Sequence, residues 1–202
     1  TEMQRRLFLE STAGFRERHD GKPLLIHADS SSSLASLGDD SPVNAVRVGL
    51  LQFGVPPFPD SVLGNVVVEP VLSFSTQVGL VKELPVGTGI SYGRTRMLER
   101  DTMVAVLTAG YGDGIPLALS NRGQVLICGQ PCPILGRVTM DQTIVDVTDL
   151  PEVAPGQVAT LIGENETQSV ALSEFAALSD SIPYEILCSI TKRVQRIYRF
   201  AE

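Results

Sequence analysis

Lysine and histidine are scarce in this 202-residue chain, which holds three lysines and two histidines. So few histidines come close to excluding a histidine-based zinc site, and we expect no metal centre. Acidic residues outnumber basic ones by 23 to 16, and the net charge of −7 argues against a nucleic-acid surface, which needs clustered Lys and Arg. No apolar run approaches the roughly 18–20 residues that span a bilayer. The sequence therefore predicts a globular protein with neither a membrane segment nor a nucleic-acid partner.

The amino terminus, Thr-Glu-Met-Gln-Arg-Arg, lacks the basic-then-apolar layout of a signal peptide. It also begins without an initiator methionine, so we expect an excised or trimmed piece of a longer chain. The three cysteines form no metal-ligand framework. Cys128 and Cys132 flank an expected hairpin turn, Gly129-Gln130-Pro131, where a disulfide and two free thiols are the alternatives. We favour free thiols in a cytoplasmic protein.

The first part of the chain has an α/β pattern. Apolar residues at helical spacing, including Leu7 and Phe15, predict a helix over 4–18 that buries one stripe. Leu24–His27 is a short apolar run of strand length. Val43–Phe53 is apolar on both faces, which is typical of a parallel strand buried on both sides.

The second part has short β-branched runs separated by glycine, proline and asparagine, which predict an antiparallel barrel or sandwich. The expected strands are Val66–Val68, Val71–Leu80, Met103–Thr108, Gln124–Cys128, Ile134–Thr139, Thr143–Val147 and Val158–Ile162. A helix is expected near Ser169–Leu178, and Ile190–Phe200 is expected to be a closing strand. We place the domain boundary near Glu69-Pro70, which gives domains over 1–68 and 69–202.

Three turn-bounded motifs stand in the second part: Ser-Tyr-Gly-Arg-Thr at 91–95, Ala-Gly-Tyr-Gly-Asp-Gly at 109–114, and Gly-Arg-Val-Thr-Met-Asp at 136–141. In this order and spacing they resemble the C-terminal half of alanine racemase, a family that uses pyridoxal 5′-phosphate (PLP) to invert the α-carbon of an amino acid. The resemblance covers about residues 24–198. It implies an α+β chain, in which the last part of a PLP-binding α/β barrel precedes a mostly antiparallel, β-barrel-like domain.

Tyr92 is the candidate catalytic residue. It lies in a glycine-flanked tight turn, where a tyrosine that packs sideways and one that projects into solvent or a partner's cleft are the local alternatives. The resemblance implies the second, with Tyr92 as one of two bases that exchange the α-proton on opposite faces of the substrate. The PLP lysine is the other base.

Four residues match the family's cofactor-binding groups. Arg47 lies in an apolar run, where burying its charge is costly unless a partner offsets it. From local sequence alone, a structural ion pair is the alternative to cofactor binding. The resemblance implies that its guanidinium faces the pyridine nitrogen of PLP, which favours reprotonation over transamination. Gly49 would let the backbone approach the phosphate. Ser30, after Asp29 in place of the usual asparagine, and Tyr184 match phosphate-binding positions, although Ser30 also suits a plain helix cap.

Substrate binding is implied for three residues. Met140 and Asp141 match a segment whose methionine amide points at the substrate carboxylate, although a methionine at a strand end is otherwise a core residue. Tyr111, with Asp113, matches a loop that shapes the opening of the site. Gly112 stands where the family commonly has alanine, and we expect it to loosen this loop slightly.

None of Lys22, Lys82 and Lys192 has a setting that suggests the Schiff-base lysine. Two interpretations remain. In the first, the chain is part of a racemase that interconverts L- and D-alanine, or serine, for peptidoglycan precursor supply, and is inactive when isolated. In the second, it is a catalytically silent β-domain used for dimerisation or binding. The resemblance also implies a homodimer in which each Tyr92 completes the partner's site.

Overall fold

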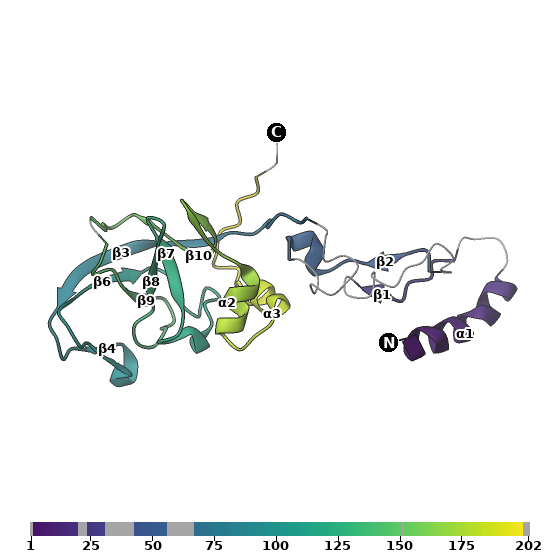
Figure 1. Cartoon of the computed structure of the whole chain (residues 1–202), viewed down its shortest axis with the longest axis horizontal. Coiled ribbons are helices and arrows are strands. Elements are labelled where there is room, and N and C mark those ends of the chain that lie inside the picture. The colour runs from purple at the N-terminus through teal and green to yellow at the C-terminus, as the bar shows by residue number, and fades with distance from the viewer. Residues whose placement is uncertain (1, 20–23, 31–42, 56–66, 151, 200–202) are drawn as a thin grey trace. The chain divides into compact units, whose positions relative to one another are not determined.

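The computed structural model describes residues 2–19, 24–30, 43–55, 67–150 and 152–199. The chain divides into two compact units, Thr1–Val71 and Leu72–Glu202 (Figure 1). Most of the regular structure belongs to the second unit.

The first unit begins with helix α1 (Glu2–Arg18), so the predicted helix is present. Its apolar stripe is not buried as expected, because Leu7 is 51% exposed and Phe15 is 64% exposed. The helix is held by local contacts such as the pair between Arg6 and Glu10, whose Nε and Oε1 atoms are 3.6 Å apart. Pairs at this spacing on an exposed helix contribute only about 0.3–0.5 kcal/mol.

Two short parallel strands follow, β1 (Asp29–Ser30) and β2 (Val46–Arg47). The parallel pairing agrees with the α/β pattern, but the lengths do not. Leu24–His27 is not a strand: the Asn44 side chain accepts the Ile26 amide at 2.8 Å and donates to the Leu24 carbonyl at 2.9 Å.

The expected long strand over Val43–Phe53 is also wrong. After β2 the chain forms a 3₁₀ turn, η2 (Leu50–Phe53), which ends at Gly54 in the left-handed conformation with φ 72°. A left-handed residue at this point stops the helical turn and redirects the chain. The start of the strand expected at Val66 lies outside the described residues.

The second unit is built on an antiparallel sheet in the order β8-β7-β10-β3-β6-β9, with β11 paired to β10. Its strands are β3 (Phe74–Leu84), β6 (Thr102–Leu107), β7 (Gln124–Ile127), β8 (Gln130–Pro133), β9 (Thr143–Asp146), β10 (Val158–Asn165) and β11 (Gln168–Val170). The chain therefore has a mostly antiparallel β-domain with few helices, as predicted.

The two ends of the strand order approach each other at one point. Ile134, just beyond β8, forms an antiparallel bridge with Val145 of β9. The neighbouring Leu135 amide donates to the Ile144 carbonyl at 2.8 Å. One bridge joins the edge strands, and the barrel itself remains a prediction.

The core lies on the inward face of these strands because apolar residues alternate along them. Val104 and Val145 are fully buried, and they belong to neighbouring strands. Helices α2 (Leu172–Leu178) and α3 (Pro183–Ser189) lie beside the sheet (Figure 1), and Phe175 of α2 is 1% exposed. The expected helix near Ser169–Leu178 is therefore present.

Two predicted strands of this unit are absent from the described residues. Ile134–Thr139 makes only the bridge at Ile134 before turning through Gly136. Ile190–Phe200 forms turns and irregular chain up to residue 199, and Arg196 donates to the Ile190, Thr191 and Val194 carbonyls. A guanidinium that binds several carbonyls of its own segment competes with strand pairing.

Candidate functional site

Tyr92 lies at the tip of a short hairpin. Strands β4 (Gly89–Ile90) and β5 (Arg96–Met97) pair antiparallel, and the 3₁₀ turn η4 (Tyr92–Arg94) connects them. The tyrosine is 73% exposed. Its side chain therefore projects away from the core of its own domain, which leaves it available to a ligand or a second chain.

The hairpin tip has a strained backbone that the rest of the domain holds in place. Ser91 and Gly93 both have positive φ, at 60° and 74°, and a serine in that region is uncommon. The Ser91 hydroxyl donates to the Arg137 carbonyl at 2.6 Å. Gly136, with φ 73°, packs so closely that a Cβ there would lie 2.7 Å from the Ile90 carbonyl oxygen. Tight contacts on both sides of Tyr92 thus fix the base of its turn.

Asn121 forms a second clamp on the same hairpin. Its side-chain oxygen accepts the Gly136 amide at 2.7 Å, and its side-chain nitrogen lies 3.1 Å from the Thr95 hydroxyl. Next to it, the Ser120 hydroxyl accepts the Val138 amide at 3.0 Å. One asparagine therefore connects the turn that carries Tyr92 to the turn that precedes Met140.

The expected substrate-binding residues lie together in the second unit. The Tyr111 amide donates to the Thr139 carbonyl at 2.9 Å, and the Gly112 amide donates to the Met140 carbonyl at 2.9 Å. These bonds bring the Tyr111 loop against the Met140–Asp141 turn. Tyr111 is 50% exposed and Met140 is 52% exposed, so Met140 is not a core residue.

The Met140 amide is available to a ligand. Within the described part of the chain its N–H has no hydrogen-bond acceptor. The donors of the preceding residue, in contrast, are both used, since the Thr139 amide and hydroxyl each donate a hydrogen bond to the Gln142 carbonyl. A free N–H on an exposed turn is suited to an anion such as a carboxylate.

Arg193 connects the same two turns through ion pairs. Its Nη2 atom lies 2.6 Å from Asp141 Oδ1, and its Nε atom lies 3.3 Å from Asp113 Oδ1. The hydrogen bond with Asp141 and the charge of Asp113 raise the pKa of Arg193 above its ordinary value. The position that a Cβ on Gly112 would take lies 2.4 Å from Arg193 Nη1, so this glycine leaves room for the guanidinium.

Residue patterns placed Asp113 and Asp141 in site motifs, but they gave no site role to the arginine that joins them. Arg193 belongs to the stretch Lys192-Arg193-Val194-Gln195-Arg196, which carries three cations in five residues. This density of positive charge is the sequence feature that could have pointed to Arg193. Its partners stand 80 and 52 residues earlier in the chain (193 − 113 and 193 − 141), so local sequence does not reveal the pairing.

The expected cofactor residues fall in both units. Ser30 of β1 and Arg47 of β2 are backbone register partners in the parallel pair, and Gly49 precedes η2. Arg47 is exposed rather than buried in a strand, because β2 covers only two residues. Its Nη1 atom hydrogen-bonds the His27 ring nitrogen and lies 3.4 Å from the His27 carbonyl. Tyr184, in the second unit, is the second residue of α3 and is 46% exposed.

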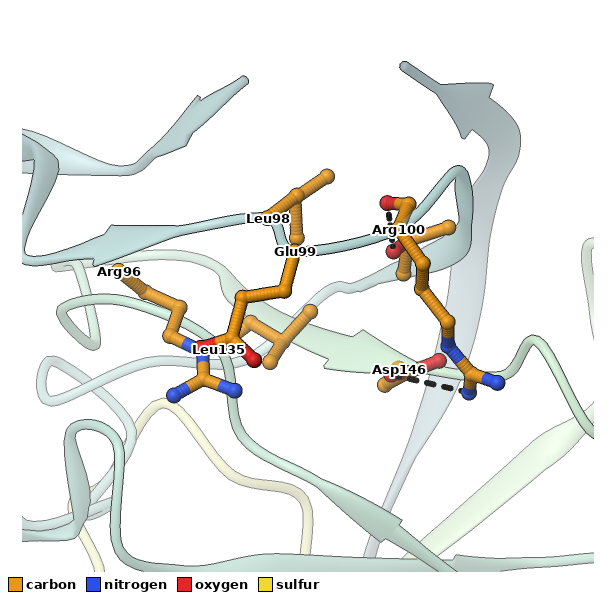
Figure 2. A pocket seen from close by; sticks show the side chains of 7 residues that line it. Arg96, Leu98, Glu99, Arg100, Leu135 and Asp146 are labelled. Atoms are coloured by element: carbon orange, nitrogen blue, oxygen red, sulfur yellow. Dashed lines mark hydrogen bonds and ion pairs between the residues drawn. The ribbon is translucent and has the colours of Figure 1, made fainter. Parts of the chain in front are cut away.

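Two hollows border the Tyr92 hairpin. The first, of about 310 Å³, is lined by Arg96 of β5 and by Arg100, which lie on opposite sides of the view in Figure 2. Arg100 pairs there with Asp146 at 3.8 Å. The second, of about 560 Å³, is lined by apolar side chains such as Leu80 and Val104 and by polar ones such as Lys82 and Gln142. The Cys132 thiol, in β8, lines neither of these two hollows. It is fully buried, and this burial raises its pKa to about 12.

The described residues offer no group of three or more His, Cys, Asp or Glu side chains that could hold a metal ion. Among the helices of those residues, none has both the length and the apolar character that crossing a membrane requires. The three cysteines are free thiols.

The fold and the site define a mostly antiparallel β-domain whose turns present exposed tyrosines and an amide N–H that has no acceptor among the described residues. The family profile described as "Alanine racemase, C-terminal domain" matches residues 71–198. The chain belongs to the alanine racemase family.

Known relatives extend the similarity beyond that domain. The alanine racemase of Halothermothrix orenii is 45% identical over 157 residues, which are 78% of this chain and 41% of the relative. The solved alanine racemase of Streptomyces coelicolor A3(2) matches with a TM-score of 0.86 and 32% identity, over 96% of this chain and 50% of that one. The enzyme of Bartonella henselae, solved with covalently bound pyridoxal phosphate, matches with a TM-score of 0.78 and 30% identity, over 94% and 50%. The chain thus spans about half the length of these relatives, which are named alanine racemases.

Proposed function

We propose that this chain is the C-terminal part of a PLP-dependent racemase that interconverts L- and D-alanine. Family membership and the cluster of Tyr111, Met140 and Asp141 support the proposal. The observation that carries it is the exposed Tyr92 on a hairpin that its own domain holds rigidly. The product, D-alanine, would supply peptidoglycan precursors, and the free thiols fit a cytoplasmic protein.

Tyr92 would act as the base on one face of the substrate. Racemisation needs a proton acceptor on one face and a donor on the other, because a single base tends to return the proton to the side from which it came. The phenol is the group of its turn that can exchange a proton at the α-carbon. Ser91 and Asn121 fix the turn on either side of Tyr92, so the ring would have less freedom to lose when substrate binds, which favours positioned acid–base catalysis.

The residues present fit PLP by their chemistry. A guanidinium suits the pyridine nitrogen, and a phenol suits a phosphate oxygen. Arg47 is exposed, and its hydrogen bonds to His27 use Nη1, so within the described residues Nε and Nη2 have no acceptor. We assign Arg47 to the pyridine nitrogen, and Ser30, Gly49 and Tyr184 to the phosphate. When bound, PLP supplies the electron sink that makes the α-proton acidic.

Arg47 would keep the pyridine nitrogen largely unprotonated, since a guanidinium does not give up its proton near neutral pH. The sink is then weaker and proton return is favoured over transamination. The Met140 amide would bind the substrate carboxylate, and Tyr111 would narrow the opening of the site. None of the three lysines is proposed to bind PLP covalently.

We also propose a two-fold homodimer in which the Tyr92 hairpin of one chain completes the site of the other, with the strand order closed into a barrel. The 73% exposure of Tyr92 supports the dimer, and the bridge between Ile134 and Val145 supports the barrel. An isologous contact of this kind gives a closed pair. Sedimentation at tens of micromolar would reveal it, and a strict monomer would contradict it.

The test of the activity uses the longest natural chain that contains these 202 residues. It is purified with PLP, and the conversion of L-alanine to D-alanine is followed with a D-amino-acid oxidase. We expect conversion in both directions, with serine as a competing substrate in a parallel arm. The 202-residue chain is treated identically, then reduced with borohydride and digested. Our proposal that none of the three lysines binds PLP covalently would be contradicted by PLP attached to Lys22, Lys82 or Lys192. Racemisation by the 202-residue chain alone would also contradict it.

A further inference from the structure

Arg193 lies between two carboxylates that come from different turns. Its contacts with Asp141 at 2.6 Å and Asp113 at 3.3 Å use different nitrogens, so one guanidinium holds both. The Asp113 side chain is 13% exposed, against 47% for Arg193. A partly buried aspartate anchors the arginine more firmly than a fully solvated one, because water screens the pair less.

The anchor is itself fixed to the loop that carries Tyr111. Asp113 Oδ2 accepts the Gly110 amide at 3.0 Å. From the segment that carries the arginine, the Thr191 hydroxyl donates to the Gly112 carbonyl at 2.8 Å. The arginine backbone and its first carboxylate therefore belong to one rigid piece, and Asp141 is the part that the guanidinium holds against it.

The pairing also changes the charge beside the proposed carboxylate site. Asp141 directly follows Met140, whose N–H has no acceptor in the described residues. An unpaired Asp141 carboxylate would repel a substrate carboxylate at that amide, since like charges a few ångströms apart disfavour binding. The guanidinium offsets this charge and holds the Asp141 oxygen toward itself.

We propose that Arg193 is a positioning residue for the substrate carboxylate. It acts by fixing the Met140–Asp141 turn against the Tyr111 loop and by neutralising Asp141. This inference rests on the proposed racemase function and deepens it. In this chain Gly112, which replaces the alanine common in the family, leaves the space that the guanidinium occupies.

Steady-state kinetics of the longest natural chain test this role. Arg193→Ala should raise the KM for L- and D-alanine roughly two- to fivefold and change kcat less than twofold, as expected when a ground-state contact is lost. Arg193→Lys should recover part of the KM, because it keeps the charge but not the two-nitrogen reach. The matched control is Arg100→Ala, since Arg100 also pairs with two aspartates, Asp149 at 2.8 Å and Asp146 at 3.8 Å.

A second substitution separates charge from mere structural support. In the Arg193→Ala background, Asp141→Asn removes the carboxylate that would otherwise repel substrate. We expect this double variant to regain at least half of the lost affinity on a logarithmic scale. The neutralising role would be overturned if the KM of the double variant stays as high as that of Arg193→Ala. It would also be overturned if Asp141→Asn lowers KM by the same factor when Arg193 is present.

Hydrogen exchange gives a readout that does not depend on activity. Arg193→Ala should speed exchange of the Tyr111 and Gly112 amides, which donate to the Thr139 and Met140 carbonyls, and Arg100→Ala should not. If wild type does not racemise alanine, the proposed function fails. Hydrogen exchange still tests whether Arg193 fixes the Met140–Asp141 turn against the Tyr111 loop. If wild type is active and Arg193→Ala matches Arg100→Ala in KM and in exchange, the inference on Arg193 fails alone.

Discussion

The side-chain oxygen of Asn121 lies 2.7 Å from the amide nitrogen of Gly136, and its side-chain nitrogen lies 3.1 Å from the Thr95 hydroxyl. These two contacts join the turn after Tyr92 to the turn before Met140. Asn121 has a positive φ of 59°, a conformation that asparagine adopts more readily than most residues. The proposed base and the proposed carboxylate site therefore share one polar support.

Asn121→Gly should loosen the Tyr92 hairpin. Glycine tolerates the positive φ, so the substitution removes the two hydrogen bonds without adding strain. Each bond is worth about 1 kcal/mol, and we expect the free energy of unfolding of the β-domain to fall by about 1–2 kcal/mol. In the active enzyme kcat should fall more than KM rises, because the misplaced group is the base.

Asn165→Ala is the control for Asn121→Gly. Asn165 makes the same two kinds of contact away from the Tyr92 hairpin. Its side-chain oxygen accepts the Gly129 amide at 2.6 Å, and its side-chain nitrogen lies 3.1 Å from the Thr160 hydroxyl. Urea unfolding and steady-state kinetics are measured for both variants. A similar loss of stability with unchanged kcat is expected for Asn165→Ala. An equal fall in kcat for both would show that the Asn121 effect is general destabilisation.

Gly112→Ala should displace the Arg193 guanidinium. The added methyl group would lie 2.4 Å from Arg193 Nη1 and 2.9 Å from the Met140 carbonyl oxygen. The arginine end can move, but the carbonyl is backbone, so we expect a loss of about 1–2 kcal/mol in unfolding free energy. KM for alanine should rise in the same direction as for Arg193→Ala, and by less.

Gly14→Ala provides the comparison, since among the described residues its methyl group would meet the far end of the Arg18 side chain, at 3.5 Å. This change lies in helix α1, where alanine is the better helix former. We expect no change in KM. An unchanged KM for Gly112→Ala as well would show that the guanidinium adapts without cost to binding.

Much of the second unit could be predicted from sequence, because alternation of apolar and polar residues reports directly on a strand with one buried face. Strand β6 (Thr102–Leu107) was expected at Met103–Thr108 for this reason. The same reasoning gave a false strand at Ile190–Phe200, where Ile197 and Tyr198 are 74% and 78% exposed. Alternation is not sufficient when Arg196 takes the carbonyls that a ladder would use.

Helix α3 has a start signal in its own sequence. Pro183 stands at its first turn and Glu185 follows in the same turn, which favour a helix start because proline needs no amide partner there and an acid suits the helix dipole. The candidate site shows a different limit. Turn motifs identified Tyr92, Tyr111 and Met140, but the link from Asn121 to Gly136 depends on the folding of separate turns against each other.

The Cys132 thiol should resist modification in the folded protein. It is fully buried, and burial raises its pKa to about 12 from an ordinary 9.0, while Cys128 and Cys188 are exposed. With Ellman's reagent at pH 8 we expect two thiols to react quickly and the third only after unfolding. Cys128→Ser and Cys188→Ser should each remove one fast thiol. Three equally fast thiols would contradict the buried position.

The raised pKa of Cys132 also predicts how stability depends on pH. The folded state holds the proton more tightly than the unfolded chain, so the contribution of this thiol is complete below pH 9 and is lost as pH rises toward 12. Urea midpoints between pH 8 and 11 should therefore fall less steeply in Cys132→Ala than in wild type. Parallel curves would remove Cys132 as the cause.

Tyr92→Phe should impair proton transfer on one face of the substrate only. Phenylalanine keeps the ring but removes the hydroxyl, and the 73% exposed side chain makes little contribution to the core, so the fold and PLP binding should survive. The lysine base of the complete enzyme would still exchange the α-proton on its own face. Loss of a positioned acid–base group costs about 10²–10⁴-fold in rate.

The measurement is deuterium incorporation from solvent, followed separately for D- and L-alanine in wild type and variant. Incorporation into one enantiomer should slow far more than into the other. Tyr198→Phe, which removes the hydroxyl of another tyrosine that is 78% exposed, should leave both rates unchanged. Equal slowing of the two enantiomers by Tyr92→Phe would mean that the phenol positions substrate or cofactor and does not serve one face. If neither slows, proton exchange proceeds without Tyr92, and its assignment as a base must be abandoned.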